Sequence, residues 1–473
     1  MNRTAIDISL SGATGTVAER HEVRDPGRVA DVVGTYPLHD VASIDALVDK
    51  ALDAQRDWAE RTAMQRWELM RAAADTVPHE ELATLLVREQ GKPLAEASME
   101  MQSLGIVLDR YRPHAEWLAE SNAAPRSGRT VRHRPFGVCG VITPWNWPFR
   151  IACALTVPAL IAGNAVVLHL SPSAPLASAR AFQVLADALP EGVLSIVTHP
   201  DPRLASRLVE HPRVRKIAFT GSTGVGRTIM GNAARGLKNL TLELGGNDPA
   251  VLLEDVEPTD ELADQLVGAS FATTGQVCMA IKRLYVPAAR VPDYVAALAA
   301  RLDREVVGHG LDQATTMGPL HTRAQRDGVQ RLVRDAVTAG ATATEHGTLA
   351  VDPEQGWYMR PTLVHGIAPD AELVAEEQFG PALPVIGYSS VDQAVAWAND
   401  SEYGLCSSVW SADLDRAFQV AERIEAGTTW INKHGMTAQD PEAPFGGVKS
   451  SGVGRISGSW GLNAFLEPHS VLA

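Results

Sequence analysis

Two residues with reactive side chains stand beside glycines near the middle of the chain. Glu243 lies in the segment LELGG (242–246), and Cys278 ends the segment GQVC (275–278). A cysteine is a strong nucleophile only as the thiolate, and its ordinary pKa of about 8.5 keeps most of it protonated at neutral pH. A carboxylate held in place can activate water to hydrolyse a thioester. The pair suggests thiol chemistry, although a cysteine beside glycines is more often a small buried apolar residue.

Alternating strand and helix patterns lead up to Glu243. Short apolar runs that are typical of buried strands occur at 137–143, 165–170, 193–197 and 216–220. Helical patterns separate them at 151–162, 177–188 and 202–210. Strands that alternate with helices indicate a parallel sheet with crossover helices.

The fourth of these strands runs into a glycine turn, GSTGVG (221–226). Its glycine spacing differs from GxGxxG, but a glycine turn between a strand and a helix suits a pyrophosphate at a helix N-terminus. Gly221, Ser222 and Gly226 are therefore candidate phosphate-binding residues, with a plain turn as the alternative.

Helices precede the first strand, and a second α/β unit begins at Pro249. The first helical pattern starts at Ser43, which with Asp45 can cap it, and others cover 64–77, 80–90 and 91–118. Later strand patterns occupy 250–253, 283–286, 362–364, 384–386, 408–410 and 428–431, with helices at 260–273, 292–302, 325–339, 391–398 and 414–424. The sequence thus predicts an α/β fold with two sheet-containing units.

Composition limits the class of protein. The 473 residues suggest about two or three domains, and 45% hydrophobic residues suit a sizeable core. A formal charge of -14 argues against binding nucleic acid or an anionic membrane surface. The four cysteines form no CxxC pair, which favours free thiols in a reducing compartment, and no His/Cys/carboxylate cluster has metal-ligand spacing.

The sequence also predicts a cytoplasmic protein. Its most apolar stretch, 151–162, contains Pro158 and is too short to span a membrane. Asp7 stands where a signal peptide needs its apolar core.

Six segments together carry a resemblance to a known family. They are TPWNWP (143–148), FTGST (219–223), LELGG (242–246), GQVC (275–278), EEQFGP (376–381) and PFGGVK (444–449). With these segments in order, the chain resembles the aldehyde dehydrogenase superfamily over nearly its whole length.

The resemblance implies a three-part architecture. It comprises a Rossmann-like, parallel-sheet dinucleotide-binding domain (1–120 and 136–245), an α/β catalytic domain (246–440) and a small β oligomerisation arm. The arm would combine the basic segment 121–135, which includes Arg126, with the tail 446–473. Proteins of this family are usually homodimers or homotetramers.

The resemblance also implies roles for three catalytic residues. Cys278 matches the nucleophile, whose thiolate attacks an aldehyde carbon. The Asn146 side-chain amide and the Cys278 backbone N–H match the donors that stabilise the resulting negative oxygen. Glu243 matches the general base that activates water. Its presence favours hydrolysis to a carboxylic acid over transfer to coenzyme A.

A nicotinamide cofactor is implied in the same way. Glu377 matches the carboxylate that holds the nicotinamide ribose, and Phe379 and Trp145 match aromatics near the cofactor. His169 and Pro172 replace the Lys and Glu that contact the adenosine ribose in relatives. Without this Lys and Glu, the choice between NAD and NADP stays open. NAD is the more frequent cofactor in the family, so we expect NAD and keep NADP as the alternative.

The expected substrate pocket departs from relatives that carry Trp followed by Lys at Ala154 and Leu155. Ala154 would then widen an apolar pocket formed with Trp147, Ile151, Val277 and Met279, which favours medium-chain or aromatic aldehydes. Two other hypotheses about the function stay open. One is a semialdehyde dehydrogenase that acylates coenzyme A, and the other is a non-catalytic binding protein on the same scaffold.

Overall fold

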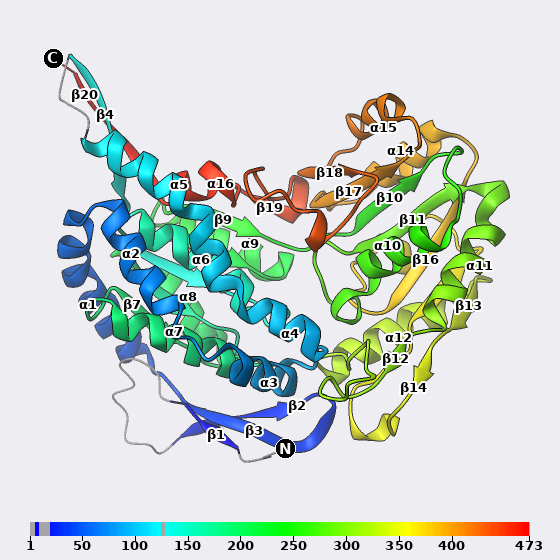
Figure 1. The fold of residues 1–473 in the computed structure, drawn as a ribbon, viewed down its shortest axis with the longest axis horizontal. Coiled ribbons are helices and arrows are strands. Elements are labelled where there is room, and N and C mark those ends of the chain that lie inside the picture. The colour runs from blue at the N-terminus through cyan, green and yellow to red at the C-terminus, as the bar shows by residue number, and fades with distance from the viewer. Residues whose placement is uncertain (1–4, 9–18, 124–127, 473) are drawn as a thin grey trace.

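The computed structural model describes residues 5–8, 19–123 and 128–472. Arg126 lies outside these described residues. The same holds for residues 1–4 and 9–18 of the predicted dinucleotide-binding domain and for residue 473 of the predicted arm. Figure 1 shows two α/β bodies side by side, a small sheet under the first body, and a two-stranded sheet of β4 and β20 that projects from the first body. The predicted α/β fold class is confirmed.

The first body is built on a sheet with the order β19-β9-β8-β5-β6-β7. Its strands are β5 (Val138–Ile142), β6 (Ala165–His169), β7 (Leu194–Val197), β8 (Val214–Thr220), β9 (Asn239–Glu243) and β19 (Gly452–Val453). All pairs are parallel except β19 with β9. Every residue of β5, β6 and β7 is buried, as expected for a parallel sheet covered on both faces.

Helices α6 (Pro148–Ile161), α7 (Leu176–Ala188), α8 (Pro202–Glu210) and α9 (Thr223–Ala234) connect these strands. The N-terminal helices are α1 (Val41–Glu60), α2 (Ala63–Ala74), α3 (His79–Gln90), α4 (Leu94–Met101) and α5 (Ser103–Ala123). The sequence prediction was wrong at two points. Asp40, not Ser43, caps α1, because its carboxylate accepts the Ser43 N–H at 2.7 Å. The single helix expected over 91–118 is divided at Gln102, whose N–H bonds to the Met99 oxygen three residues back.

The second body contains a sheet with the order β13-β15-β16-β11-β10-β17-β18, in which only the β13–β15 pair is antiparallel. Its strands are β10 (Asp248–Leu252), β11 (Ile281–Pro287), β13 (Thr342–Glu345), β15 (Thr362–His365), β16 (Ala382–Tyr388), β17 (Cys406–Trp410) and β18 (Thr428–Ile431). The helices are α10 (Asp260–Phe271), α11 (Val291–Leu302), α12 (Arg323–Thr338), α13 (Glu372–Ala375), α14 (Val391–Asn399) and α15 (Leu414–Ala421). A two-stranded sheet pairs β12 (Val306–Val307) with β14 (Thr348–Leu349).

Two smaller sheets complete the fold. β1 (Ile6–Asp7), β2 (Arg20–Asp25) and β3 (Arg28–Pro37) form one, with a turn at Pro26 and Gly27. The projecting two-stranded sheet pairs β4 (Arg129–Pro135) with β20 (Leu466–Leu472) in antiparallel fashion. α16 (Gly458–Asn463) precedes β20, and β19 joins the first sheet, so residues 446–472 contribute to both the projecting two-stranded sheet and the first body.

A buried ion pair beside the short helix α4 organises the region between the bodies. Lys92 Nζ lies 2.5 Å from Glu100 Oε2, and both side chains are fully buried. Lys92 also donates to the backbone oxygen of Asn146 at 2.8 Å. Glu100 Oε1 accepts the N–H groups of Phe149 and Arg150, at 2.8 and 3.2 Å, at the start of α6. The pair therefore fixes the loop between β5 and α6.

A second carboxylate of α4 reaches the other body. Glu96 accepts the backbone N–H and the hydroxyl of Thr273, at 2.9 and 2.6 Å, just beyond α10. One turn of α4 separates Glu96 from Glu100, so both carboxylates lie on the same side of the helix. We call Lys92, Glu96 and Glu100 the α4 clamp, because together they tie the Asn146 loop to the loop that leads to Cys278.

Replacing Lys92 by Met should strongly destabilise the protein, because it leaves the Glu100 carboxylate buried without its cation. We expect a loss of about 3–5 kcal/mol in the free energy of unfolding, with part of it recovered in the double variant K92M/E100Q. The matched control is Lys50→Met, which removes an exposed pair with Glu191 and should cost at most about 1 kcal/mol. Denaturant titration measures each value, and equal losses in the two variants would contradict the role of the clamp.

Candidate active site

The nucleophile candidate Cys278 lies in a loop shaped by unusual backbone conformations. A 3₁₀ turn (Ala272–Gly275) follows α10, and Thr273 and Thr274 have φ values of 50° and 59°. Gly275 has a φ of +75°, and a Cβ there would lie 2.4 Å from the Gly380 oxygen, so only glycine fits. These constraints hold the segment that precedes Cys278 in one conformation.

A buried lysine, Lys282, forms hydrogen bonds with the backbone of the same loop. Lys282 Nζ donates to the backbone oxygens of Val277 and Cys278 at 2.7 and 2.9 Å. Burial raises the pKa of the Cys278 thiol to about 12, against an opposing effect of the Lys282 charge. The thiol is therefore protonated at neutral pH, and its use as a nucleophile requires removal of that proton.

Asn146 joins the two bodies at this loop. Its side-chain Nδ2 donates to the Gln276 oxygen at 3.0 Å, while its backbone oxygen accepts from Lys92. Asn146 is buried, and one N–H of its amide remains for another acceptor next to the cysteine loop. The residue thus offers a fixed, uncharged hydrogen-bond donor.

Glu243 ends β9, immediately before the glycines that cross to the second body. Its side chain is buried, and neither carboxylate oxygen has a hydrogen-bond partner in the described residues. Burial raises the pKa of Glu243 well above its ordinary value, although the Arg455 charge opposes this. A Cβ on Gly446 would lie 2.6 Å from Glu243 Oε1, so glycine leaves space beside the carboxyl group.

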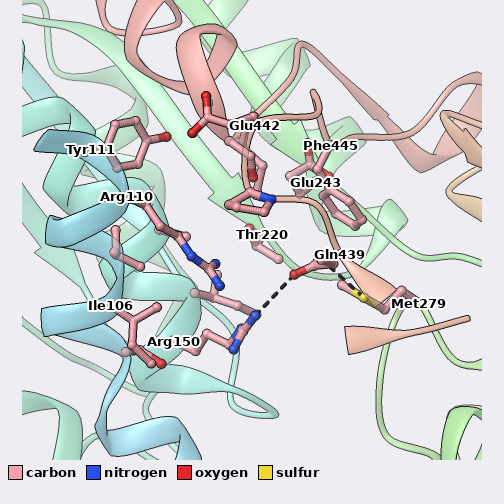
Figure 2. Close-up of a pocket in the computed structure, with 18 of the residues that line it drawn as sticks. Ile106, Arg110, Tyr111, Arg150, Thr220, Glu243, Met279, Gln439, Glu442 and Phe445 are labelled. Carbon is pink, nitrogen blue, oxygen red and sulfur yellow. Dashed lines mark hydrogen bonds between the residues drawn. The ribbon is translucent and has the colours of Figure 1, made fainter. Parts of the chain in front are cut away.

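Two cavities meet at Cys278. The first, here called the α5–α6 cavity, is lined by Ile106, Val107, Arg110, Tyr111, Arg150, Ile151, Ala154, Glu243, Met279, Gln439, Glu442 and Phe445, among others. Figure 2 shows Thr220 and Glu243 on one side of it and Arg110 and Arg150 extending from α5 and α6 on the other. The second, the glycine cavity, is lined by Trp145, Asn146, Gly221, Ser222, Gly245, Glu377 and Phe379, among others. Four residues line both cavities: Ile151, Thr220, Leu244 and Cys278.

The glycine cavity combines a carboxylate with aromatic rings. Glu377 Oε1 accepts the Gly246 N–H at 3.1 Å, and a Cβ on Gly245 would lie 2.4 Å from Glu377 Oε2. Trp145 stacks on His321 with ring centroids 4.4 Å apart and meets Phe379 edge-on at 5.8 Å. Ser222 caps α9, whose N-terminus faces the same region. This arrangement suits a ligand with phosphate, sugar and planar ring groups.

Two predicted cofactor residues lie outside the lining of the glycine cavity. Gly226 is buried against Leu244, where a Cβ would lie 2.4 Å from a methyl carbon, so close packing alone requires glycine. His169 ends β6 with both ring nitrogens buried and without a partner among the described residues. Burial lowers the pKa of His169 to about 4, so its ring is neutral at pH 7.

The predicted substrate-pocket residues divide into two groups. Ile151, Ala154 and Met279 line the α5–α6 cavity. Trp147 is instead buried beneath Lys92, whose Nζ lies 3.7 Å from its ring centroid. Val277 lines a separate cavity, which Met279 also lines.

Sequence reasoning missed four charged residues at this site: Lys92, Arg110, Arg150 and Lys282. Arg150 is the second residue after the segment TPWNWP (143–148). The sequence alone therefore shows a cation next to the helix that was expected to line the substrate pocket. The contacts of the two lysines depend on loops far apart in sequence, and no local pattern reveals them.

Metal and membrane features add little to this picture. In residues 5–8, 19–123 and 128–472, no group of three or more His, Cys, Asp and Glu side chains could hold a metal ion. No helix in these ranges is long and apolar enough to cross a membrane.

Comparison with known proteins identifies the family. The model of the aldehyde dehydrogenase family matches residues 14–471. A geranial dehydrogenase of Castellaniella defragrans is 38% identical over 450 residues, which are 93% of each chain. The structure is similar to that of a Mycobacterium tuberculosis aldehyde dehydrogenase complexed with NAD+ (TM-score 0.92, 31% identity, 99% of each chain). It is also similar to an Escherichia coli NADP-dependent enzyme (TM-score 0.88, 30% identity, 96% of this chain and 94% of the other). The chain therefore belongs to the aldehyde dehydrogenase family.

Proposed function

We propose that this protein oxidises an aldehyde to the carboxylic acid with NAD(P), through a covalent intermediate on Cys278. The observation that carries the proposal is that Cys278 stands where two cavities meet, with Glu243 in one and Glu377 in the other. A single sulfur atom can then face a substrate on one side and a cofactor on the other.

The proposed reaction begins at the thiol. After losing its proton, the Cys278 sulfur attacks the aldehyde carbon and forms a tetrahedral thiohemiacetal. The negative oxygen of this intermediate accepts hydrogen bonds from the free N–H of the Asn146 amide and from the Cys278 backbone N–H. Loss of one such donor typically lowers the rate by about 10²–10³-fold. The α4 clamp supports this step because it fixes the loop that carries Asn146.

The glycine cavity fits a nicotinamide dinucleotide, because Glu377 offers an acceptor for ribose hydroxyls and the rings of Trp145 and Phe379 offer flat apolar surfaces. When bound there, the cofactor supplies an acceptor for the hydride that leaves the thiohemiacetal carbon. Gly221 and Ser222 would contact its phosphates at the start of α9. His169, at the end of β6, would lie near the adenosine ribose by its match to the family, but its ring nitrogens are buried and outside the lining of this cavity.

Glu243 completes the proposed cycle. Loss of hydride leaves a thioester on Cys278, and the Glu243 carboxylate removes a proton from the water that hydrolyses it. Because burial raises the pKa of Glu243, the ionised form that this role requires becomes more populated as the pH rises. The product is the free acid, and transfer to coenzyme A is the alternative.

The neutral state of His169 favours NAD. A 2′-phosphate is bound best by a cation, and the uncharged His169 ring supplies none at pH 7. The glutamate that would repel a 2′-phosphate is also missing at Pro172, so NADP remains the alternative cofactor.

The apolar part of the α5–α6 cavity supports a medium-chain or aromatic aldehyde. Ala154 is half-buried on α6 and faces this cavity beside Ile151 and Met279. The name of the Castellaniella relative, geranial dehydrogenase, agrees with an apolar substrate.

We also propose the domain division and the oligomeric state. The dinucleotide-binding domain would comprise 1–120 and 136–245, the catalytic domain 246–440, and the arm 121–135 and 446–473. A homodimer or homotetramer would cover the apolar side chains that the arm exposes: Val131, Val471 and Leu472 are 42%, 49% and 71% exposed.

Steady-state rates over a panel of short, medium-chain and aromatic aldehydes test the function. We expect NAD to give a kcat/KM at least about tenfold above that with NADP, and Cys278→Ala to lower turnover by at least about 10³-fold. The acid should form at the same rate with and without coenzyme A. Turnover that survives in C278A, or a product that appears only with coenzyme A, would refute the mechanism.

Ala154→Trp should fill the α5–α6 cavity and change the chain-length preference. We expect kcat/KM for medium-chain and aromatic aldehydes to fall about tenfold, a penalty in the usual range for overpacking, with acetaldehyde affected far less. Acetaldehyde in the same variant serves as the internal control. An unchanged ratio between long and short aldehydes would show that Ala154 does not set the pocket size.

Val471→Glu should shift the protein towards smaller species, because a charge then faces the apolar contact between copies. Light scattering coupled to size-exclusion chromatography measures the mass. Leu414→Glu, at an exposed apolar residue of α15 away from the arm, is the control and should leave the mass unchanged. A wild-type monomer would rule out the oligomer altogether.

A further inference from the structure

The α5–α6 cavity contains two arginines that an apolar aldehyde would not use. Arg110 projects from α5 and Arg150 from α6, and Figure 2 shows both side chains extending into the same space. Burial and the nearby Arg110 charge both lower the pKa of Arg150, as expected for a half-buried cation beside a like charge. Among the described residues, neither guanidinium forms an ion pair with a carboxylate within 4.0 Å, whereas most other arginines of the chain do.

The acidic groups of the same cavity do not neutralise this pair. Glu243 is buried, and burial raises its pKa, which disfavours the charged form. Glu442 is exposed, so solvent screens its charge, and its carboxylate lies 3.0 Å from His114 Nε2. Glu100 accepts the backbone N–H of Arg150 and is paired with Lys92, and its charge raises the pKa of Arg150 without forming an ion pair with the guanidinium. Among the described residues, neither guanidinium group therefore has a carboxylate within 4.0 Å.

A neighbouring amide holds one of the arginines in place. Arg150 donates to Gln439 Oε1 at 3.2 Å, and Gln439 Nε2 contacts the Met279 sulfur at 3.5 Å. This bond uses one N–H of Arg150 and leaves most of its donors available. Since Met279 directly follows Cys278, the arrangement sets an oriented guanidinium on the substrate side of the nucleophile.

We propose that Arg110 and Arg150 bind a carboxylate at the far end of the aldehyde, so that the preferred substrate is an ω-carboxy aldehyde. This inference rests on the proposed function and names the substrate class of the same site. The aldehyde end lies at Cys278, the chain runs along apolar side chains such as Ile151, Ala154 and Phe445, and the anion lies between the arginines. Planar guanidinium groups suit this role because they match the two oxygens of a carboxylate.

The test compares straight-chain ω-carboxy aldehydes of increasing length with their methyl esters, with unsubstituted aldehydes of equal carbon count, and with geranial. We expect the best acid to exceed its ester in kcat/KM by at least about tenfold, the size of one charge-assisted hydrogen bond. Arg150→Met should abolish that advantage mainly through KM, and Arg150→Lys should retain part of it. Rates with neutral aldehydes should fall much less than rates with the acid.

Arg112→Met is the matched control. Arg112 lies on α5 two residues from Arg110, is exposed, and pairs with Glu116 outside the cavity, so its loss should leave the preference for the acid intact. Arg110→Met, at an exposed position, provides a second variant if Arg150→Met does not fold. An ester or geranial turned over as well as the acid, or equal losses for acid and ester in R150M, would overturn the proposal.

The outcomes separate this inference from the proposed function. Cys278-dependent oxidation of neutral aldehydes without preference for the acid would defeat the inference and leave the function standing. If no aldehyde is oxidised, calorimetry with the dicarboxylates from glutarate to suberate decides the inference alone. Binding that weakens at least about tenfold in R150M and not in R112M supports the anion site, and absence of binding to the wild type refutes it.

Discussion

The buried pair of Lys92 and Glu100 is the interaction on which the arrangement of the site depends. Removing two charges from water is costly, and the cost is offset only because both groups are fully satisfied. Lys92 reaches the Asn146 oxygen, and Glu100 receives two backbone N–H groups at the start of α6. One helical turn away, Glu96 holds Thr273 in the other body. A short helix thereby sets the distance between the proposed oxyanion donor and the nucleophile loop.

Burial has a second consequence at the centre of the site. It raises the pKa of both the Cys278 thiol and the Glu243 carboxyl group, so it disfavours the charged form of each in the ligand-free protein. Charge then has to form during the reaction, in a site where fixed donors such as Asn146 interact strongly with it because little water competes. The half-buried Arg150 guanidinium in the same cavity has no carboxylate within 4.0 Å among the described residues, so an anionic ligand would stabilise it.

Much of this fold could be predicted from sequence because buried parallel strands are short apolar runs, as in β5, β6 and β7. The hairpin of β2 and β3 and the strand β9 were missed because polar, partly exposed residues interrupt their patterns. Cys278, Glu243 and Asn146 were found because recognisable segments surround them. The roles of Lys92 and Arg150 were not found, because these roles depend on contacts between α4, α5, α6 and distant loops. Trp147 lies outside the α5–α6 cavity because the Lys92 cation packs over its ring.

Mass spectrometry of an acyl-enzyme tests the central claim most directly. The variant Glu243→Gln should still form the thioester but hydrolyse it slowly, so incubation with NAD and a turned-over aldehyde should load one acyl group on the protein. The account predicts that proteolysis locates the added mass on the peptide containing Cys278, and that hydroxylamine removes it. An unmodified Cys278, or an acyl group on another residue, would contradict the account.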